Sequence, residues 1–177
     1  MITYVLAVLC GALVMVFDQY TKHLIAANYV LGGKGKVLIP GLIDIIYVRN
    51  DGGAWGMLGG STWLLLSLTV VIMLVCIALL LKYGAKNKFM FWAILLIISG
   101  GLGNMIDRIF RGGYVVDFLH FTFWDSFPVF NVADCAIVIG GAMLVLYLIS
   151  GIFKEYRNKK KDAIKEYKEK AEENEGN

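Results

Sequence analysis

Four long apolar runs, each without a charged residue, restrict what this chain can fold into more than any other feature. They are Ile2–Phe17, Thr62–Leu81, Phe89–Ile106 and Cys135–Phe153. A helix rises about 1.5 Å per residue, so each run approaches the roughly 30 Å thickness of a bilayer's hydrocarbon core. The sequence therefore predicts a membrane all-α bundle of four transmembrane helices, at residues 2–27, 62–81, 89–108 and 131–153.

The two longer connections between these spans differ in composition. Residues 31–61 are rich in glycine and contain two stretches of β-branched residues, Lys36–Ile39 and Leu42–Arg49. This pattern predicts a small β-sheet with glycine turns between the first and second spans. Residues 111–129 are dense in aromatic side chains. They predict an aromatic interfacial loop, at the depth of the lipid headgroups, between the third and fourth spans.

Charged residues are concentrated at the C-terminal end. Residues 154–177 hold eight Lys or Arg and seven Asp or Glu, whereas residues 1–153 hold nine basic and seven acidic side chains. The alternating signs predict a solvated, charged tail at 154–177, separate from a membrane domain at 1–153. The net charge of +3 is too small for a surface that follows nucleic-acid phosphates, so no nucleic-acid partner is expected.

An even number of spans places both termini on the same side of the membrane. The short basic turn between the second and third spans shares that side with the first part of the tail. Together they hold eight Lys or Arg, against six on the other side. Because cytoplasmic loops carry the excess of Lys and Arg, we expect both termini in the cytoplasm and an extracytoplasmic sheet.

With this topology, polar residues from three spans meet near the outer face of the bilayer. By span, they are Asp18 and Lys22, then Asn104, Asp107 and Arg108, and finally Asn131 and Asp134. Each group is spaced three or four residues apart and so shares one helical face. Charged groups are costly inside a bilayer, and their presence there indicates a functional site by default.

Several kinds of catalysis lack their usual residues in this sequence. His23 and His120 are isolated, and the sequence contains neither an HExxH motif nor a Cys/His cluster, so no metal is expected. No serine lies in a Gly-x-Ser-x-Gly motif. Spacing alone leaves a Ser/Lys pair open, with Ser126 of the outer loop as its serine.

Aspartates offer another chemistry. Two carboxyl groups held close together share a proton, so one acts as a general base on water and the other as a general acid. Asp117 lies in the apolar outer segment, and Asp134 lies at the start of the fourth span. These two residues are the natural candidates for such a pair.

Five short blocks that contain these residues occur in order along residues 5–153. They are Asp18-Gln19-Tyr20-Thr21-Lys22, Asn50-Asp51-Gly52-Gly53-Ala54-Trp55-Gly56, Gly103-Asn104-Met105-Ile106-Asp107-Arg108, Val115-Val116-Asp117-Phe118 and Phe130-Asn131-Val132-Ala133-Asp134. In this order, on a four-span pattern, they resemble the lipoprotein signal peptidase family, also called signal peptidase II. One departure is Gly53, where the family often has alanine.

The resemblance implies a bacterial inner-membrane aspartic endopeptidase with its active site near the outer face. Such an enzyme cleaves the signal peptide from diacylglyceryl-modified prolipoproteins just before the lipidated cysteine. The family's catalytic aspartates map onto Asp117 and Asp134. The residues expected to bind substrate or support the site are Asn50, Asn104, Asp107, Arg108 and Asn131, with Asp18 and Lys22 from the first block. We expect a monomer that contacts membrane lipids and needs no cofactor.

Two other functions would also place aspartates in spans. A membrane transporter or proton pathway would need polar groups through the bilayer or interrupted helices at its midplane. Here the polar groups gather largely at one end of the spans. A lipid-binding assembly factor would use the aromatic loop, but it would not require both Asp117 and Asp134.

Overall fold

The structure is a computed structural model that describes residues 1–53, 55 and 57–175. Ala54 and Gly56 of the second block, and the last two residues of the tail, lie outside the described residues. The elements follow in the order α1 (Ile2–Asn28), β1 (Lys36–Ile39), β2 (Ile43–Asn50), α2 (Thr62–Tyr83), the 3₁₀ helix η2 (Gly84–Lys86), α3 (Lys88–Phe110), β3 (Val115–Phe121) and α4 (Val132–Glu175).

The predicted four-helix membrane architecture is confirmed. Among the described residues, the helices that are long and apolar enough to cross a membrane are Ile2–Asn28, Thr62–Tyr83, Lys88–Phe110 and Val132–Asp162. α3 occupies the centre of the bundle, where it packs against α4, α1 and α2. α2 is apolar on all sides, and large residues such as Trp63 and Leu81 stay exposed. Such a helix is suited to lipid rather than water.

Glycine allows α3 and α4 to pack closely. A Cβ atom on Gly100 of α3 would collide with the carbonyl oxygen of Ala133 on α4. A Cβ atom on Gly140 of α4 would lie 2.6 Å from the carbonyl oxygen of Ala93 on α3. Small residues are the usual means of close helix packing in membranes. Here they bring the polar ends of α3 and α4 together.

The sheet is antiparallel, with strand order β1-β2-β3. β1 and β2 agree with the predicted strands to within one residue. β3, however, comes from the connection between α3 and α4, where the sequence predicted an aromatic loop. It pairs with β2 so that Asn50 lies opposite Val115, and Val48 lies opposite Asp117. The aromatic cluster of that connection begins at Phe121, the last residue of β3, and continues beyond the strand.

One face of the sheet packs on the C-terminal end of α1. Ile25 of α1, Tyr47 of β2, and Val116 and Phe118 of β3 form a buried apolar cluster there. Because side chains alternate along a strand, Asp117 points to the opposite face. The packing on α1 therefore determines the direction in which Asp117 points.

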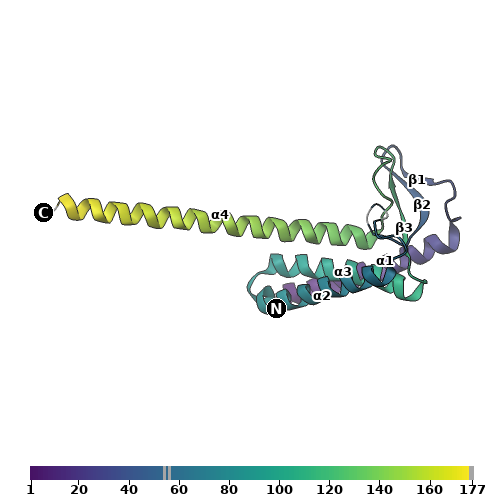
Figure 1. The fold of residues 1–177 in the computed structure, drawn as a ribbon, viewed down its shortest axis with the longest axis horizontal. Helices are drawn as coiled ribbons and strands as arrows, with labels where there is room; N and C mark the ends of the chain where they lie inside the picture. Colours follow the sequence, from purple (N-terminus) through teal and green to yellow (C-terminus); the bar gives the residue numbers. More distant parts are fainter. Residues whose placement is uncertain (54, 56, 176–177) are drawn as a thin grey trace.

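The sheet lies at one end of the helical bundle, and both termini lie toward the other (Figure 1). α4 continues through the charged tail as far as Glu175 and projects beyond α1, α2 and α3. At 44 residues, it is about 66 Å long, roughly twice the hydrocarbon thickness. The described part of the tail is therefore a continuation of the fourth helix.

Gly100→Ala is expected to lower the thermal stability, because the added methyl group would force α3 and α4 apart at a cost of about 1–3 kcal/mol. Gly141→Ala in α4 is a matched control, since a Cβ atom there meets nothing within 4 Å. Alanine is favoured over glycine in a helix by about 1 kcal/mol. Thermal unfolding in detergent compares the two variants. A melting temperature of Gly100→Ala equal to or above that of Gly141→Ala would contradict the proposed close packing.

Candidate active site

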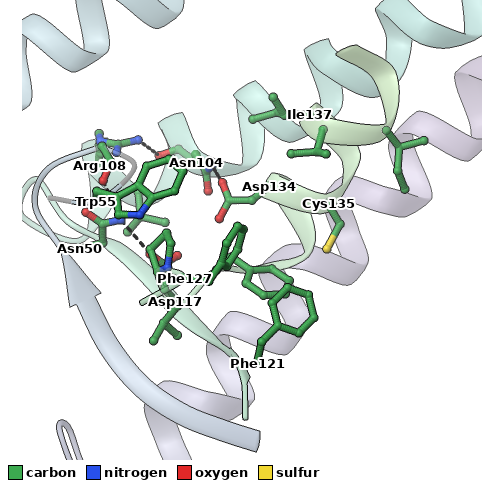
Figure 2. Close-up of a pocket in the computed structure, with 17 residues that line it drawn as sticks. Asn50, Trp55, Asn104, Arg108, Asp117, Phe121, Phe127, Asp134, Cys135 and Ile137 are labelled. Carbon is green, nitrogen blue, oxygen red and sulfur yellow. Dashed lines mark hydrogen bonds between the residues drawn. The ribbon is translucent and has the colours of Figure 1, made fainter. Parts of the chain in front are cut away.

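A cavity of about 740 Å³ lies where the sheet meets α3 and α4. Asp117 of β3 and Asp134 of α4 both line it, and Figure 2 shows them on its wall with Asn50, Asn104 and Arg108. The remaining lining is mostly apolar and includes Trp55, Val115, Phe121, Phe127, Pro128, Val129, Phe130, Ile137, Val138 and Ile139. The cavity thus combines two carboxyl groups with a largely apolar wall.

Asp117 is almost fully buried, with 2% of its surface exposed. Its Oδ2 accepts a hydrogen bond from Asn50 Nδ2 at 2.8 Å, and its Oδ1 accepts one from Asn131 Nδ2 at 2.6 Å. The pKa of Asp117 is raised to about 7, chiefly by burial and also by the negative charge of Asp134. The two amide donors oppose this rise. This carboxyl group is therefore poised to hold a proton near neutral pH.

Asp134 is held by the N-terminus of α4. Asn131 is the N-cap residue, and its Oδ1 accepts a hydrogen bond from the backbone N–H of Asp134 at 3.0 Å. In return, Asp134 Oδ2 accepts a bond from the backbone N–H of Asn131 at 3.1 Å. This reciprocal arrangement is a capping box, with aspartate in the place of the usual Glu or Gln. The positive end of the helix dipole favours a negative charge at this position.

Three asparagines form hydrogen bonds with the two aspartates. Asn104 Nδ2 donates to Asp134 Oδ1 at 2.7 Å, while its own Oδ1 accepts from Asn131 Nδ2 at 3.2 Å. Asn131 therefore contacts both Asp117 and Asp134, and Asn50 completes the set from β2. Amides donate hydrogen bonds without adding charge, so they orient the carboxyl groups without neutralising them.

A buried ion cluster lies behind this layer. Lys22 Nζ is 2.9 Å from Asp18 Oδ2, 3.4 Å from Asp107 Oδ2 and 2.8 Å from Asn104 Oδ1. The side chains of Lys22, Asp18 and Asp107 are all 0% exposed. Arg111 adds a second cation, with its Nε 3.0 Å from Asp107 Oδ1. Each buried charge thus has at least one opposite charge within reach.

Arg108 joins α3 to the loop that follows β2. Its Nη2 donates to the carbonyl oxygen of Gly52 at 2.8 Å, and the N–H of Gly52 donates to Asn50 Oδ1 at 3.0 Å. These bonds hold the amide of Asn50 over Asp117. The Nε of Arg108 is buried and has no hydrogen-bond partner among the described residues.

Aromatic rings form the rim of the cavity. Phe127 lies at the centre of this group of rings, with its ring centroid 6.0 Å from that of Trp55 and 5.3 Å from that of Phe121. Trp124 and Phe130 extend the cluster at 5.0 Å and 5.8 Å from Phe127. The backbone of Trp55 has a φ of 56°, which is unusual for a bulky residue. The ring of Trp55 lines the cavity and packs against Phe127.

The structure brings all nine residues selected from the sequence into one region. Asn50, Asn104, Arg108, Asp117 and Asp134 line the cavity, whereas Asn131, Asp18, Lys22 and Asp107 lie behind it. Within the part of the chain that the structure describes, no group of three or more His, Cys, Asp and Glu side chains is arranged to hold a metal ion.

Sequence reasoning missed four contributors. Gln19 Nε2 donates to Asp18, to Asp107 and to the carbonyl oxygen of Gly103, and its place in the first block was the available signal. Gly103 is needed because a Cβ atom there would lie 2.6 Å from Asp18 Oδ2. Trp55 and Phe127 are far apart in sequence, so no local pattern indicated that their rings meet.

Comparison with known proteins agrees with the resemblance of the five sequence blocks. The sequence model of the family described as Signal peptidase (SPase) II matches residues 10–150. The lipoprotein signal peptidases of Staphylococcus aureus strains JH9 and Newman are each 38% identical to this chain over 160 residues. Each alignment covers 90% of this chain and 94% of the relative.

Two solved structures are also similar. One is a bacterial membrane enzyme determined by the in meso method at 2.3 Å resolution, with a TM-score of 0.77 and 35% identity. The match covers 81% of this chain and 87% of that one. The other is a bacterial membrane enzyme at 1.9 Å resolution, with a TM-score of 0.73, 36% identity and coverages of 80% and 91%.

Asp117→Asn is expected to change the pH dependence of stability. The folded protein holds the Asp117 proton up to a pKa of about 7, whereas an ordinary Asp, as in the unfolded chain, has a pKa of 3.8. The resulting stabilisation is complete below about pH 4 and is lost as the pH rises toward 7, by up to about 1.4 kcal/mol per pH unit. The wild type should therefore lose stability relative to Asp117→Asn across this range. Denaturant unfolding at successive pH values measures both, and parallel profiles would contradict the assignment.

Proposed function

The chain belongs to the signal peptidase II family and is therefore a membrane signal peptidase; from this premise we propose that it is an aspartic endopeptidase. Its proposed substrates are diacylglyceryl-modified prolipoproteins, cleaved just before the lipidated cysteine. The observation that carries the proposal is that Asp117 and Asp134 line the same cavity and are joined through Asn131.

The local charge balance supports a dyad with one proton. The hydrogen-bonded network around the cavity, within the described residues, has three cationic side chains, Lys22, Arg108 and Arg111. It has four carboxyl groups, Asp18, Asp107, Asp117 and Asp134. One proton shared by the dyad makes this network electrically neutral. A buried net charge would be costly, so the singly protonated state is favoured.

The surroundings of the two aspartates suggest their roles. The pKa of Asp117 is raised to about 7, and Asp117 is proposed to hold the proton. Asp134 accepts hydrogen bonds from the side chain of Asn104 and from the backbone N–H of Asn131, and it is proposed to carry the negative charge. Two carboxyl groups in different environments are the usual basis for separate acid and base roles.

The proposed reaction uses both groups in turn. Asp134 removes a proton from water, and the water oxygen bonds to the carbonyl carbon of the scissile peptide. Asp117 donates its proton to the carbonyl oxygen at the same time. The proton on Asp134 then passes to the leaving nitrogen as the C–N bond breaks, and a hydroxyl proton of the intermediate returns to Asp117. The guanidinium of Arg108 lines the cavity and is proposed to bind a substrate carbonyl oxygen.

The cavity's composition supports a lipidated substrate. Its wall on α4 includes Ile137, Val138 and Ile139, and Val138 is 68% exposed. An apolar wall that continues onto the outside of the bundle suits an acyl chain or a signal-peptide helix arriving through the bilayer. The aromatic rim suits the headgroup level.

We place the protein in the bacterial inner membrane with both termini cytoplasmic and the cavity near the outer face, because basic residues gather at the opposite end. The domains proposed are 1–153, the peptidase, and 154–177, the cytoplasmic tail. All the side chains proposed for catalysis come from one chain, so a monomer suffices.

A transporter or proton pathway, or a lipid-binding assembly factor, is less well supported. The buried ionisable groups gather at the end of the bundle that carries the sheet, and the family relationship is to a peptidase. Neither alternative function requires two carboxyl groups joined through one asparagine.

Asp117→Asn and Asp134→Asn are each expected to lower cleavage of a diacylglyceryl-modified prolipoprotein by at least about a thousandfold, because each removes an acid–base group. The assay uses purified protein in detergent, and melting temperatures verify that the variants are folded. Full activity in either folded variant would refute the dyad. Equal cleavage of the unlipidated substrate by the wild type would refute the lipid specificity.

The pH profile of cleavage should have an alkaline limb near pH 7. As the pH rises through about 7, the dyad loses its single proton, so kcat/KM falls. Asn50→Ala should move this limb to a higher pH, because the hydrogen bond from Asn50 lowers the pKa of Asp117. A limb that stays in place or moves to lower pH in this variant would show that Asp117 does not control it.

A further inference from the structure

Three fully buried charged residues lie outside the cavity. Among the described residues, Asp18, Lys22 and Asp107 are 0% exposed and do not line the cavity wall. A buried ionic cluster is weak evidence for stability, because a well-packed apolar replacement is often neutral or stabilising. The contacts of these residues therefore need another explanation.

Asp18 holds the start of the helix that carries Asp134. Its Oδ1 accepts a hydrogen bond from the backbone N–H of Ala133 at 2.8 Å. Ala133 is the second residue of α4 and immediately precedes Asp134. The first N–H groups of a helix lack partners within it. Asp18, from α1, supplies one of them from a different element.

Asp107 makes the corresponding contact with the strand that carries Asp117. Its Oδ2 accepts a hydrogen bond from the backbone N–H of Val116 at 3.0 Å, and this bond is buried. Val116 immediately precedes Asp117 on β3. Asp18 and Asp107, the two scaffold aspartates, thus each bind the backbone amide one residue before a dyad aspartate.

Lys22 links the two scaffold aspartates. Its ammonium lies 2.9 Å from Asp18 and 3.4 Å from Asp107, and it also donates to Asn104 Oδ1 at 2.8 Å. The last bond turns the Nδ2 of Asn104 toward Asp134. Gln19 reinforces the link by donating to both scaffold aspartates at 3.2 Å. The Lys22 ammonium therefore connects Asp18, which binds the start of α4, with Asp107, which binds β3.

We infer that the Asp18–Lys22–Asp107 triad is a positioning unit that sets the separation and orientation of Asp117 and Asp134. Among the described residues it forms no hydrogen bond with either carboxyl group of the dyad, and it acts through backbone amides and through Asn104. The inference rests on the proposed dyad and extends it. A displacement of about 1 Å at a reacting group can cost a hundredfold in rate, so such a support affects catalysis directly.

The test compares two variants with the same charge. Asp18→Asn/Lys22→Met and Asp18→Ala/Lys22→Met both lose one negative and one positive charge. Only the first keeps an oxygen that can accept the N–H of Ala133. We expect the Asn variant to have a kcat about 10- to 100-fold above that of the Ala variant, with KM within about threefold. Asp107→Asn/Lys22→Met and Asp107→Ala/Lys22→Met give the same comparison at Val116.

Both kcat values are measured per folded molecule, well below the melting temperature of each variant. A purely structural role would change the melting temperature and leave kcat equal within each pair. Equal kcat values of the Asn and Ala variants at either position would overturn the inference. It would also be overturned if neither variant of a pair folds, or if only the Ala variant folds. Full activity of Asp117→Asn or Asp134→Asn would instead overturn the proposed function, so the two failures are distinguishable.

Discussion

A fully buried ammonium group needs ion-pair and hydrogen-bond partners, and this requirement organises one end of the protein. Lys22 lies in an apolar helix, and its ion pairs and hydrogen bond draw Asp18, Asp107 and Asn104 around it. Because these residues belong to α1 and α3, the cluster brings those helices together at one level. Its carboxyl groups also bind the amides of Ala133 and Val116, so α4 and β3 are held at the same point.

The sheet determines the direction in which the side chain of Asp117 points. A strand presents alternate residues to opposite faces. On β3, Val116 and Phe118 pack against the end of α1, which leaves Asp117 facing the cavity. Asn50 reaches the same carboxyl group from the neighbouring strand. Packing of apolar residues on one face thus positions a titratable group on the other.

Local sequence patterns predicted a large part of this arrangement. Uncharged runs indicated the four helices because span length and apolarity depend only on neighbouring residues. The spacing of Asp18 and Lys22 placed them on one helical face, and the structure contains an ion pair between them, at 2.9 Å. The pattern could not indicate β3, because an aromatic segment of this kind becomes a strand only through pairing with β2, more than sixty residues earlier.

The sequence by itself determined the membrane architecture and the residue types available at one end of it. Each of these is a property of a continuous segment, set by length, apolarity and helical spacing. Only the tertiary structure decided that Asn131 contacts both Asp117 and Asp134, and that Lys22 connects the supports of both. Those contacts join residues from different helices and strands, and their geometry exists only once close packing and buried hydrogen bonds have brought the elements together.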